Sequence, residues 1–159
     1  GRPVTALVIR RAAPADVELI AANNRAMALE TEGKVLDTAT TLRGAAALIA
    51  DATKGFYLVA ERASEVAGQL MVTYEWSDWR NGTFWWIQSV YVSPAARRSG
   101  VFRALYRRVH EMAADAGDVC GIRLYVETAN ARAQSTYVAL GMKRSHYELY
   151  ELDLDFGSS

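Results

Sequence analysis

The segment from Val90 to Arg108 most constrains how this chain can fold, because it contains a strand, a short loop and a helix in direct succession. The apolar, strand-like run ends at Pro94, and the loop that follows carries Arg97–Gly100. A loop of arginine and glycine before a helix N-terminus forms an anion site, because first-turn N–H groups point outward and the helix dipole adds positive charge. The segment therefore favours a pyrophosphate, and with it nucleotide or coenzyme chemistry.

Length and composition indicate one folded domain. The chain has 159 residues, of which 51% are hydrophobic, and a chain of this size buries roughly two thirds of its unfolded surface. We expect a single domain over residues 1–159, with an ordered core over about 4–155. Lysine plus arginine and aspartate plus glutamate each number 18, so no net field favours nucleic acid or an anionic membrane.

Other classes of protein are excluded by what the sequence lacks. No apolar run reaches the roughly 20 residues that span a bilayer, and the first residues lack a signal-peptide core. The single cysteine, Cys120, excludes an intramolecular disulfide, and with only two histidines it leaves no ordinary Cys/His zinc site. We therefore expect a soluble, cytoplasmic protein that binds no metal.

Hydrophobic periodicity and turn signals predict an α+β fold with the element order β-α-α-β-β-β-α-β-α-β. Asn81-Gly82 is a tight-turn signal, and Gly141 is a helix stop. Asp37 or Thr38 caps the second predicted helix. The strands are expected over 4–10, 56–61, 66–75, 83–92, 122–126 and 145–154. The helices are expected over 14–29, from Asp37 or Thr38 to before Gly55, over 100–116 and over 130–140.

Two motifs make the chain resemble the GNAT superfamily of N-acetyltransferases. Arg97–Phe102 is similar to the family's Gln/Arg-x-x-Gly-x-Gly/Ala pyrophosphate loop. Asn130–Met142 is similar to its Asn-x-x-Ala-x-x-x-Tyr-x-x-x-Gly-Phe segment, except that Met142 replaces the last Phe. The resemblance implies a mixed, mostly antiparallel sheet of about six or seven strands, flanked by about four α-helices.

The resemblance also implies acetyl-CoA as the coenzyme. Val90 and Val92 would offer main-chain bonds to the pantetheine arm, and the N–H groups of Arg98–Arg103 would cradle the diphosphate. Arg97, Arg98 or Arg103 would add positive charge. The coenzyme-binding residues are thus expected to be Val90, Tyr91, Val92, Arg97, Arg98, Ser99, Gly100, Val101, Phe102, Arg103, Asn130, Ala133 and Tyr137. A solvated basic loop before an ordinary surface helix is the alternative for this segment.

Phe102 departs from the family pattern, because it stands where Gly or Ala usually lets the backbone approach the phosphates. Its ring must turn away into the core or toward the pantetheine arm for the loop to stay open. If the ring covers the loop instead, coenzyme binding is weakened or lost.

Tyr137 is the leading catalytic candidate. Transfer from a thioester expels a thiolate, and a phenol beside the sulfur donates a proton as it leaves. Ala133, Tyr137 and Leu140 share one helical face, which we expect to point toward the sheet. A core tyrosine with a satisfied hydroxyl is the alternative. Asn130 has two compatible roles, as an N-cap and, by the resemblance, as a partner of the coenzyme arm.

The acceptor amine must lose a proton, since a free alkylamine has a pKa of about 10.4. Glu30 and Glu32, in the expected break between the first two helices, are the leading pair for catalysis and for binding a cationic amine. Solvated loop carboxylates are the alternative for both. Glu75, with Asp78, could instead stabilise a turn against Arg80. The acceptor-binding residues are expected to be Glu30, Glu32, Tyr74, Glu75, Trp85 and Gln88.

Four tryptophans cluster around one predicted hairpin, at positions 76, 79, 85 and 86. They could line a cleft for a cation, pack in the core or form a dimer interface. By alternation we expect Trp85 or Trp86 to point inward, with Trp76 and Trp79 near the cleft or a partner. The hairpin and the final strand make a homodimer plausible.

The function predicted from all these features is direct transfer of an acetyl group from acetyl-CoA to a primary amine of a small-molecule or amino-acid-like acceptor. The alternative is a catalytically silent acyl-CoA-binding or sensor module with the same fold. Phe102 and Gln88 favour the silent module, whereas Tyr137 and the two glutamates favour the enzyme.

Overall fold

The computed structural model describes residues 6–154 and residue 156. The chain divides into two compact units, Gly1–Leu124 and Tyr125–Ser159, and each is described by itself. The expected core limits, residues 4 and 155, and the first residues of the strand expected over 4–10 lie outside the described residues.

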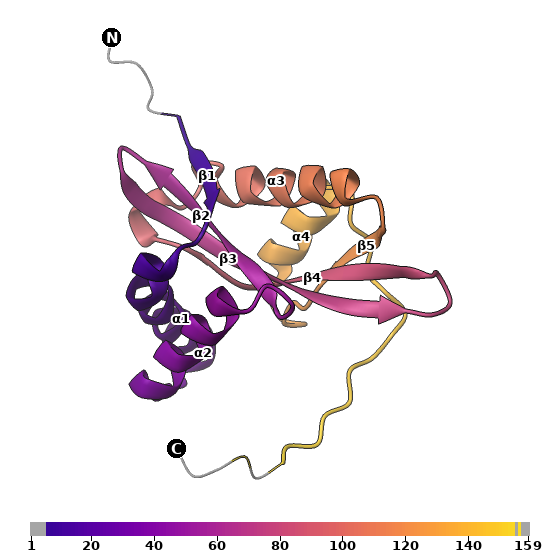
Figure 1. Ribbon diagram of the computed structural model, residues 1–159, viewed down its shortest axis with the longest axis horizontal. Coiled ribbons are helices and arrows are strands. Elements are labelled where there is room, and N and C mark those ends of the chain that lie inside the picture. Colours follow the sequence, from indigo (N-terminus) through magenta and orange to yellow (C-terminus); the bar gives the residue numbers. More distant parts are fainter. Residues whose placement is uncertain (1–5, 155, 157–159) are drawn as a thin grey trace. The chain divides into compact units, whose positions relative to one another are not determined.

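The first unit contains a five-stranded sheet in the order β1-β2-β3-β4-β5 (Figure 1). The strands are β1 (Val8–Arg11), β2 (Gly55–Arg62), β3 (Glu65–Ser77), β4 (Gly82–Val92) and β5 (Val119–Leu124). Successive strands from β1 to β4 are antiparallel, whereas β4 and β5 are parallel. The prediction of a mixed, mostly antiparallel sheet is therefore confirmed.

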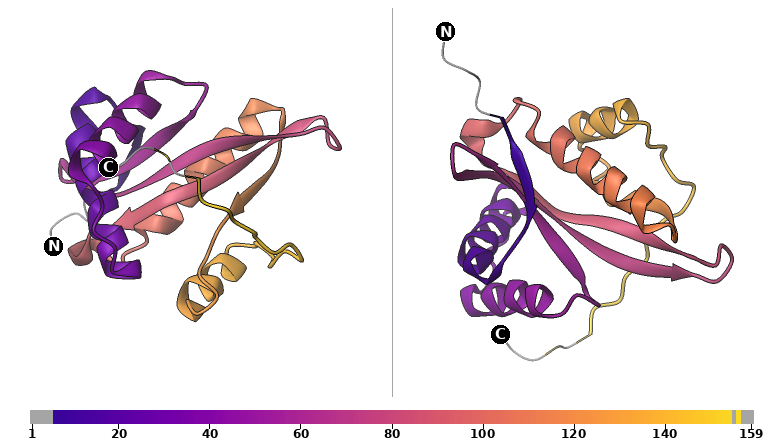
Figure 2. Two further views of the ribbon diagram at one scale, coloured as in Figure 1. Left: turned by 90° about the horizontal axis from the view of Figure 1, so that it is seen from below. Right: turned by 45° about the horizontal axis from the view of Figure 1, so that its top comes forward.

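Helices cover both faces of this sheet, with α1 and α2 on one face and α3 on the other (Figures 1 and 2). The helical segments of the first unit are η1 (Pro14–Asp16), α1 (Val17–Glu32), α2 (Thr38–Ala50), η2 (Pro94–Ala96) and α3 (Val101–Ala116). Adjacent residues of β3 identify the two faces. Gln69 hydrogen-bonds to Asn24 of α1, whereas a Cβ on Gly68 would meet Val101 of α3. The two residues contact different helices because successive strand residues point to opposite faces of the sheet.

Local sequence signals explain most element boundaries. Asp37 caps α2 by accepting a 2.9 Å hydrogen bond from the Thr40 N–H, as predicted. Ala63 and Ser64, which both have positive φ, form the two-residue turn between β2 and β3. The first helix extends further than predicted, because it ends only at Gly33, in the left-handed conformation with φ of +63°.

The core on the α1–α2 face is apolar, and one polar side chain is buried beside it. Tyr57 and Val59 of β2 pack against Ile20, Ala45 and Leu48 of the two helices. Gln69 of β3 is 0% exposed and hydrogen-bonds to Asn23 and Asn24 of α1. These bonds satisfy an amide that would otherwise be costly to bury.

The second unit contains α4 (Ala131–Ala139). Asn130 caps it by accepting a 3.1 Å hydrogen bond from the Ala133 N–H, and Gly141 follows it with φ of +95°, as predicted. The prediction of a strand over 145–154 is wrong, because these residues form no strand in the described part of the chain. The described sheet therefore has five strands rather than six or seven, since alternating apolar residues form a strand only when a neighbour pairs with them.

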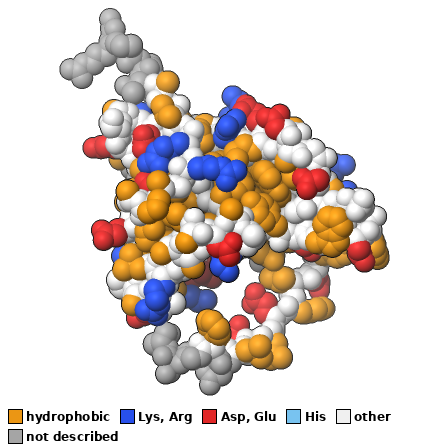
Figure 3. All heavy atoms as spheres, viewed as in Figure 1, with side chains coloured by type: hydrophobic (Ala, Val, Ile, Leu, Met, Phe, Trp, Pro, Cys, Tyr) orange, Lys and Arg blue, Asp and Glu red, His pale blue; other side chains and the backbone are white. Residues whose placement is uncertain are grey.

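The hairpin of β3 and β4 extends beyond β2, whose pairing with β3 ends at Thr73 (Figure 1). Trp85 is buried there, as predicted for it or its neighbour, whereas Trp76 and Trp79 are 62% and 92% exposed. Charged side chains of both signs lie among hydrophobic ones on the face shown in Figure 3. Within the described residues, no helix is long and apolar enough to cross a membrane.

Candidate functional site

Strand β4 is interrupted by a bulge, and shortly before it the pairing with β5 ends. Ser89 and Val90 both lie opposite Leu70 of β3, and Ser89 has a left-handed backbone with φ of +51°. The pairing of β4 with β5 stops at Ile87 and Leu124. β5 itself ends at Leu124, so residues 88–92 of β4 have no β5 partner along that edge, and their main-chain groups must bond elsewhere.

The loop after β4 has the geometry of an anion site. Arg98 and Gly100 have left-handed backbones with φ of +63° and +82°. Among the described residues, no side chain caps the N-terminus of α3, and apart from the neighbouring chain none of their atoms lies within 4 Å of the position that a Cβ on Gly100 would take. First-turn N–H groups have no partners within their own helix, so this open loop suits a negatively charged group.

Arg97, at the start of the predicted pyrophosphate motif, contacts α1. Its Nη2 lies 2.7 Å from Oε2 of Glu30, and its Nε donates a 3.0 Å hydrogen bond to the carbonyl of Val92. The hydroxyl of Tyr91 donates to Oε1 of the same glutamate over 3.3 Å. Burial and the adjacent carboxylate raise the pKa of the Tyr91 phenol. The structure thus brings together three of the predicted site residues, Glu30, Tyr91 and Arg97.

The two glutamates of α1 are not in a break between helices, as predicted, but in the last turn of α1. Two carboxylates at this end face the negative pole of the helix dipole. Arg97 offsets the charge of Glu30, and Glu32 pairs with Lys34 over 3.8 Å.

Arg62 also contacts the loop, although no sequence signal pointed to it. Its two terminal nitrogens donate to the hydroxyl and the carbonyl of Ser99, over 3.1 and 3.4 Å. Its Nε is buried and has no hydrogen-bond partner. Arg62 ends β2, far from the loop in sequence, so only the folded chain places the two together.

Phe102 packs along its own helix. Its ring centroid lies 6.2 Å from that of Tyr106, one turn further along α3, and the side chain is half-buried. The expectation that the ring leaves the coenzyme loop open stays a prediction.

Two of the predicted acceptor residues lie on the α3 face of the sheet. Tyr74 and Trp85 are cross-strand partners, their ring centroids are 6.0 Å apart, and both contact Phe56. With Thr83 and Asp118 they line a pocket. Burial raises the pKa of Tyr74.

Glu75 and Gln88 lie on the opposite face, which α1 and α2 partly cover. Oε1 of Glu75 accepts 2.9 Å hydrogen bonds from Nε1 of Trp86 and Nη1 of Arg123. Gln88 donates a 2.6 Å bond to the hydroxyl of Thr73. The partners of Glu75 are thus Trp86 across the hairpin and Arg123, rather than Arg80, which lies over the ring of Phe84.

The sheet therefore separates the predicted acceptor residues into two sets. Glu75 and Gln88 lie on the face of the sheet that is covered by α1, the helix that carries Glu30. Tyr74 and Trp85 lie on the other face, which α3 covers. The reason is the two-residue period of a strand, which sends neighbouring side chains to opposite faces. The structure does not bring the six residues to one place.

The second unit carries the other predicted residues. Ala133 and Tyr137 are half-buried and lie one turn apart on α4, and burial raises the pKa of the Tyr137 phenol. The side-chain oxygen of Asn130 accepts the capping bond from Ala133, which confirms the first of its two predicted roles.

Comparison with known proteins assigns the family. A family model described as the acetyltransferase (GNAT) family matches residues 19–142. The structure is similar to that of a possible acetyltransferase from Clostridium difficile 630, with 43% sequence identity, a TM-score of 0.87, and coverage of 93% of this chain and 97% of that one. No curated protein matches the sequence.

More distant structures share the fold. One is described as a predicted acetyltransferase with acetyl-CoA from Clostridium acetobutylicum, with 17% identity, a TM-score of 0.75, and coverage of 93% and 96% of the two chains. Another is an aminoglycoside acetyltransferase from an uncultured soil metagenomic sample, with 21% identity, a TM-score of 0.68, and coverage of 94% and 97%.

This chain belongs to the GNAT family of acetyltransferases. Members of the family are transferases that use acetyl-CoA and act on small-molecule or protein acceptors.

Proposed function

We propose that this protein transfers an acetyl group directly from acetyl-CoA to a primary amine of a small-molecule or amino-acid-like acceptor. The observation that carries the proposal is the combination of the β4 bulge, the end of the β4–β5 pairing at Ile87, and the open loop before α3. When bound, acetyl-CoA supplies the acetyl group as a reactive thioester.

The residues present fit this coenzyme. The main-chain groups of Val90 and Val92 lie past the end of the β4–β5 pairing, where they would hold the amides of the pantetheine arm. The N–H groups from Arg98 to Arg103 would cradle the diphosphate, and the left-handed backbones of Arg98 and Gly100 support this role, since such conformations are typical of anion-binding loops. Phe102 packs beside Tyr106, which supports an open loop.

Tyr137 is proposed as the general acid. During transfer the amine nitrogen would form a bond to the acetyl carbon and lose a proton to water, while the carbon–sulfur bond would break. The phenol would give its proton to the departing sulfur and would then regain one from water. The raised pKa of Tyr137 supports this role, because the phenol then keeps its proton throughout the neutral range.

The amine is proposed to bind on the α1–α2 face of the sheet. Glu75 supports this choice, because Oε1 of its half-exposed carboxylate accepts two fixed hydrogen bonds and thereby holds the group in place. Gln88 lies on the same face, nearer the bulge. Glu32 lies in the last turn of the helix that covers this face and would add negative charge near a cationic amine.

A silent acyl-CoA-binding module is the second candidate function. It is favoured by one observation, that Gln88 supplies an amide bonded to Thr73 at the central position of β4 where a proton-accepting carboxylate would suit catalysis. The two candidates share the coenzyme site and differ only in turnover.

Calorimetric titration with acetyl-CoA, with free CoA as comparison, tests the coenzyme site that the two candidate functions share. Micromolar binding of both is expected, and no detectable binding of either would contradict both candidates. An assay of thiol release with a panel of amines then separates the two. Release that depends on an added amine supports the enzyme, whereas binding without release from any amine supports the silent module.

A further inference from the structure

The side chain of Arg97 joins the loop before α3 to two elements of the fold, α1 and β4. It pairs with Glu30 at the end of α1 over 2.7 Å. Its Nε bonds to the carbonyl of Val92, the last residue of β4, and its guanidinium lies 5.6 Å from the ring centroid of Tyr91. The Tyr91 hydroxyl completes the cluster by donating to Glu30. We call these residues, Glu30, Tyr91, Val92 and Arg97, the loop clasp.

The loop clasp acts where the backbone changes direction. Arg97 is extended, with ψ of 148°, and the next residue, Arg98, is left-handed with φ of +63°. From Arg98 onward the N–H groups belong to the open loop and the first turn of α3. Holding the Arg97 side chain against β4 and α1 therefore sets the direction in which these N–H groups point.

The position of Glu30 at the end of α1 suits it to be the ion-pair partner of Arg97. A carboxylate in the last turn of a helix faces the negative pole of the helix dipole, and it gains most from a cation placed beside it. Both oxygens of Glu30 are engaged within the clasp, one by Arg97 and one by Tyr91.

We propose that Arg97 is a positioning residue of the coenzyme site, that Glu30 is its anchor, and that the charge opposite the coenzyme diphosphate comes from Arg98 and Arg103. This inference rests on the proposed function. It differs from the prediction that Arg97 contributes charge directly to the phosphates and that Glu30 binds the amine. On this proposal, the Arg97–Glu30 ion pair fixes the coenzyme loop to the end of α1.

The two possible roles of Arg97 predict opposite changes in the affinity for acetyl-CoA when Glu30 is replaced by glutamine. If Arg97 is a phosphate ligand, Glu30→Gln removes a competing negative charge at 2.7 Å, so acetyl-CoA should bind more tightly. If Arg97 is a positioning residue, the same substitution frees the loop, and acetyl-CoA should bind more weakly. Arg97→Lys adds a second contrast, because lysine keeps the charge but lacks the planar fork that reaches both Glu30 and Val92.

Calorimetric titration of the full chain with acetyl-CoA measures these signs. We expect Glu30→Gln and Arg97→Lys each to weaken binding by about fivefold, a size typical of a half-exposed ion pair. The double variant should bind no more weakly than Arg97→Lys alone, because the two residues act through each other. Glu32→Gln is the matched control, two residues further along the same turn, and should change the affinity by less than about twofold.

Steady-state kinetics separates positioning from a general loss of structure. The KM for acetyl-CoA should rise in both variants, while kcat at saturating acetyl-CoA and the KM for the amine stay unchanged. If Glu30→Gln lowers the midpoint of thermal unfolding, Tyr91→Phe provides a milder variant, which removes only the hydroxyl bond to Glu30 and should weaken binding to a smaller extent.

Tighter or unchanged binding by Glu30→Gln, or full affinity in Arg97→Lys, would overturn the loop clasp. An increased KM for the amine in Glu30→Gln would also overturn it, and would indicate that Glu30 binds the amine instead. Failure of the unsubstituted protein to bind acetyl-CoA would instead overturn the proposed function itself.

Discussion

Gln69 of β3 and Asn24 of α1 are joined by a 3.0 Å hydrogen bond from the glutamine Nε2 to the asparagine Oδ1. A second bond, from Asn23 to the Gln69 carbonyl oxygen, also measures 3.0 Å. Because Gln69 is fully buried, these bonds hold α1 in one register on the sheet. The same helix ends in the turn that carries Glu30, so the position of the loop clasp depends on this buried contact.

Replacement of Gln69 by methionine, which has similar volume and no polar atoms to pair, should be strongly destabilising. The two half-buried asparagines would lose their bonds to Gln69, and the expected loss in the free energy of unfolding is about 2–3 kcal/mol. Urea unfolding followed by circular dichroism measures it. A loss below about 0.5 kcal/mol would show that the asparagines find other partners.

Gly68→Ala should loosen the start of α3. A Cβ at this position would lie 2.7 Å from Cγ1 of Val101 and 3.1 Å from the Tyr91 carbonyl oxygen, so the expected loss of unfolding free energy is about 1–3 kcal/mol. Gly44→Ala in α2 is the matched control. A Cβ there has nothing within 4 Å, and alanine should stabilise the helix by up to about 1 kcal/mol. Equal effects in the two variants would contradict the close packing of α3 on β3.

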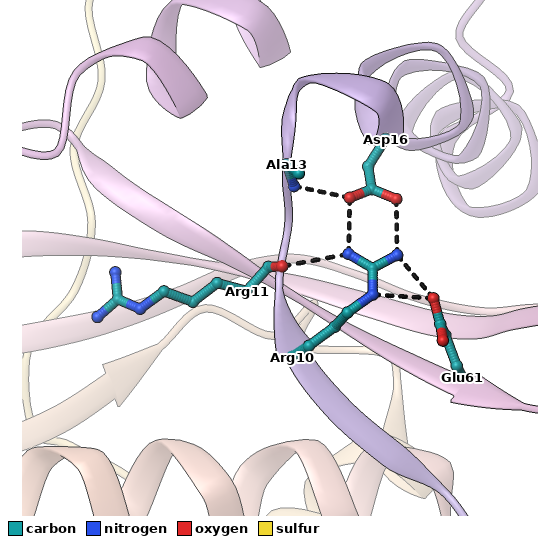
Figure 4. Close-up of polar contacts among 5 residues, drawn as sticks. All are labelled: Arg10, Arg11, Ala13, Asp16 and Glu61. Carbon is teal, nitrogen blue, oxygen red and sulfur yellow. Dashed lines mark hydrogen bonds and ion pairs between the residues drawn. The ribbon is translucent and has the colours of Figure 1, made fainter. Parts of the chain in front are cut away.

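The ion pair between Arg10 and Asp16 should make stability depend on pH in the acid range. Two parallel bonds of 2.8 and 2.9 Å join the side chains (Figure 4). The Arg10 guanidinium lowers the pKa of Asp16 below its ordinary value of 3.8, and a bond from the Ala13 N–H contributes to the same effect. A lowered folded-state pKa contributes stability that is complete above the unfolded value and is lost as the pH falls through the folded one.

Asp16→Asn tests this dependence. At pH 7 the substitution should lower the free energy of unfolding by about 1.5–3 kcal/mol, as for other hydrogen bonds to charged groups. The difference between the two proteins should shrink as the pH falls below 3.8, because Asp16 then takes up a proton in the unfolded state of the unsubstituted protein before it does so in the folded state. Urea unfolding between pH 7 and pH 3 measures it, and a difference that stayed constant would rule out titration of Asp16 as its source.

Tyr137→Phe should slow turnover by more than about tenfold and leave acetyl-CoA affinity nearly unchanged, because it removes the proton donor and keeps the ring. Burial raises the pKa of this phenol, so the unsubstituted enzyme should show no loss of activity from Tyr137 below about pH 10. Tyr147→Phe is the control, since that side chain is in the same unit and exposed. Equal rates for Tyr137→Phe and the unsubstituted enzyme would remove Tyr137 from the reaction.

Local chemistry made the secondary structure predictable. Asp37 and Asn130 cap helices because their side chains reach the N–H groups of the same chain segment, and such signals extend over only three residues. The loop of Arg97–Gly100 could be found in the same way, since its motif is contained in neighbouring residues, although the contacts that hold it come from Glu30 and Arg62.

Other features depend on a partner far away in the sequence. The alternation over 145–154 predicted a strand, but no strand pairs with it in the described residues. Arg62 and Ser99 meet only because β2 ends beside the loop. Nothing near Glu30 indicated that α1 would continue past it, or that its partner would be Arg97.

The sequence by itself determined the elements, their caps and the two motifs of the GNAT family, because each of these is written in residues that are close along the chain. Only the tertiary structure decided which predicted residues meet. It joined Glu30 to Arg97 and separated Tyr74 from Glu75, since the face on which a side chain lies depends on strand register and on a bulge of one residue. These choices are made by long-range pairing and packing, which no local pattern encodes.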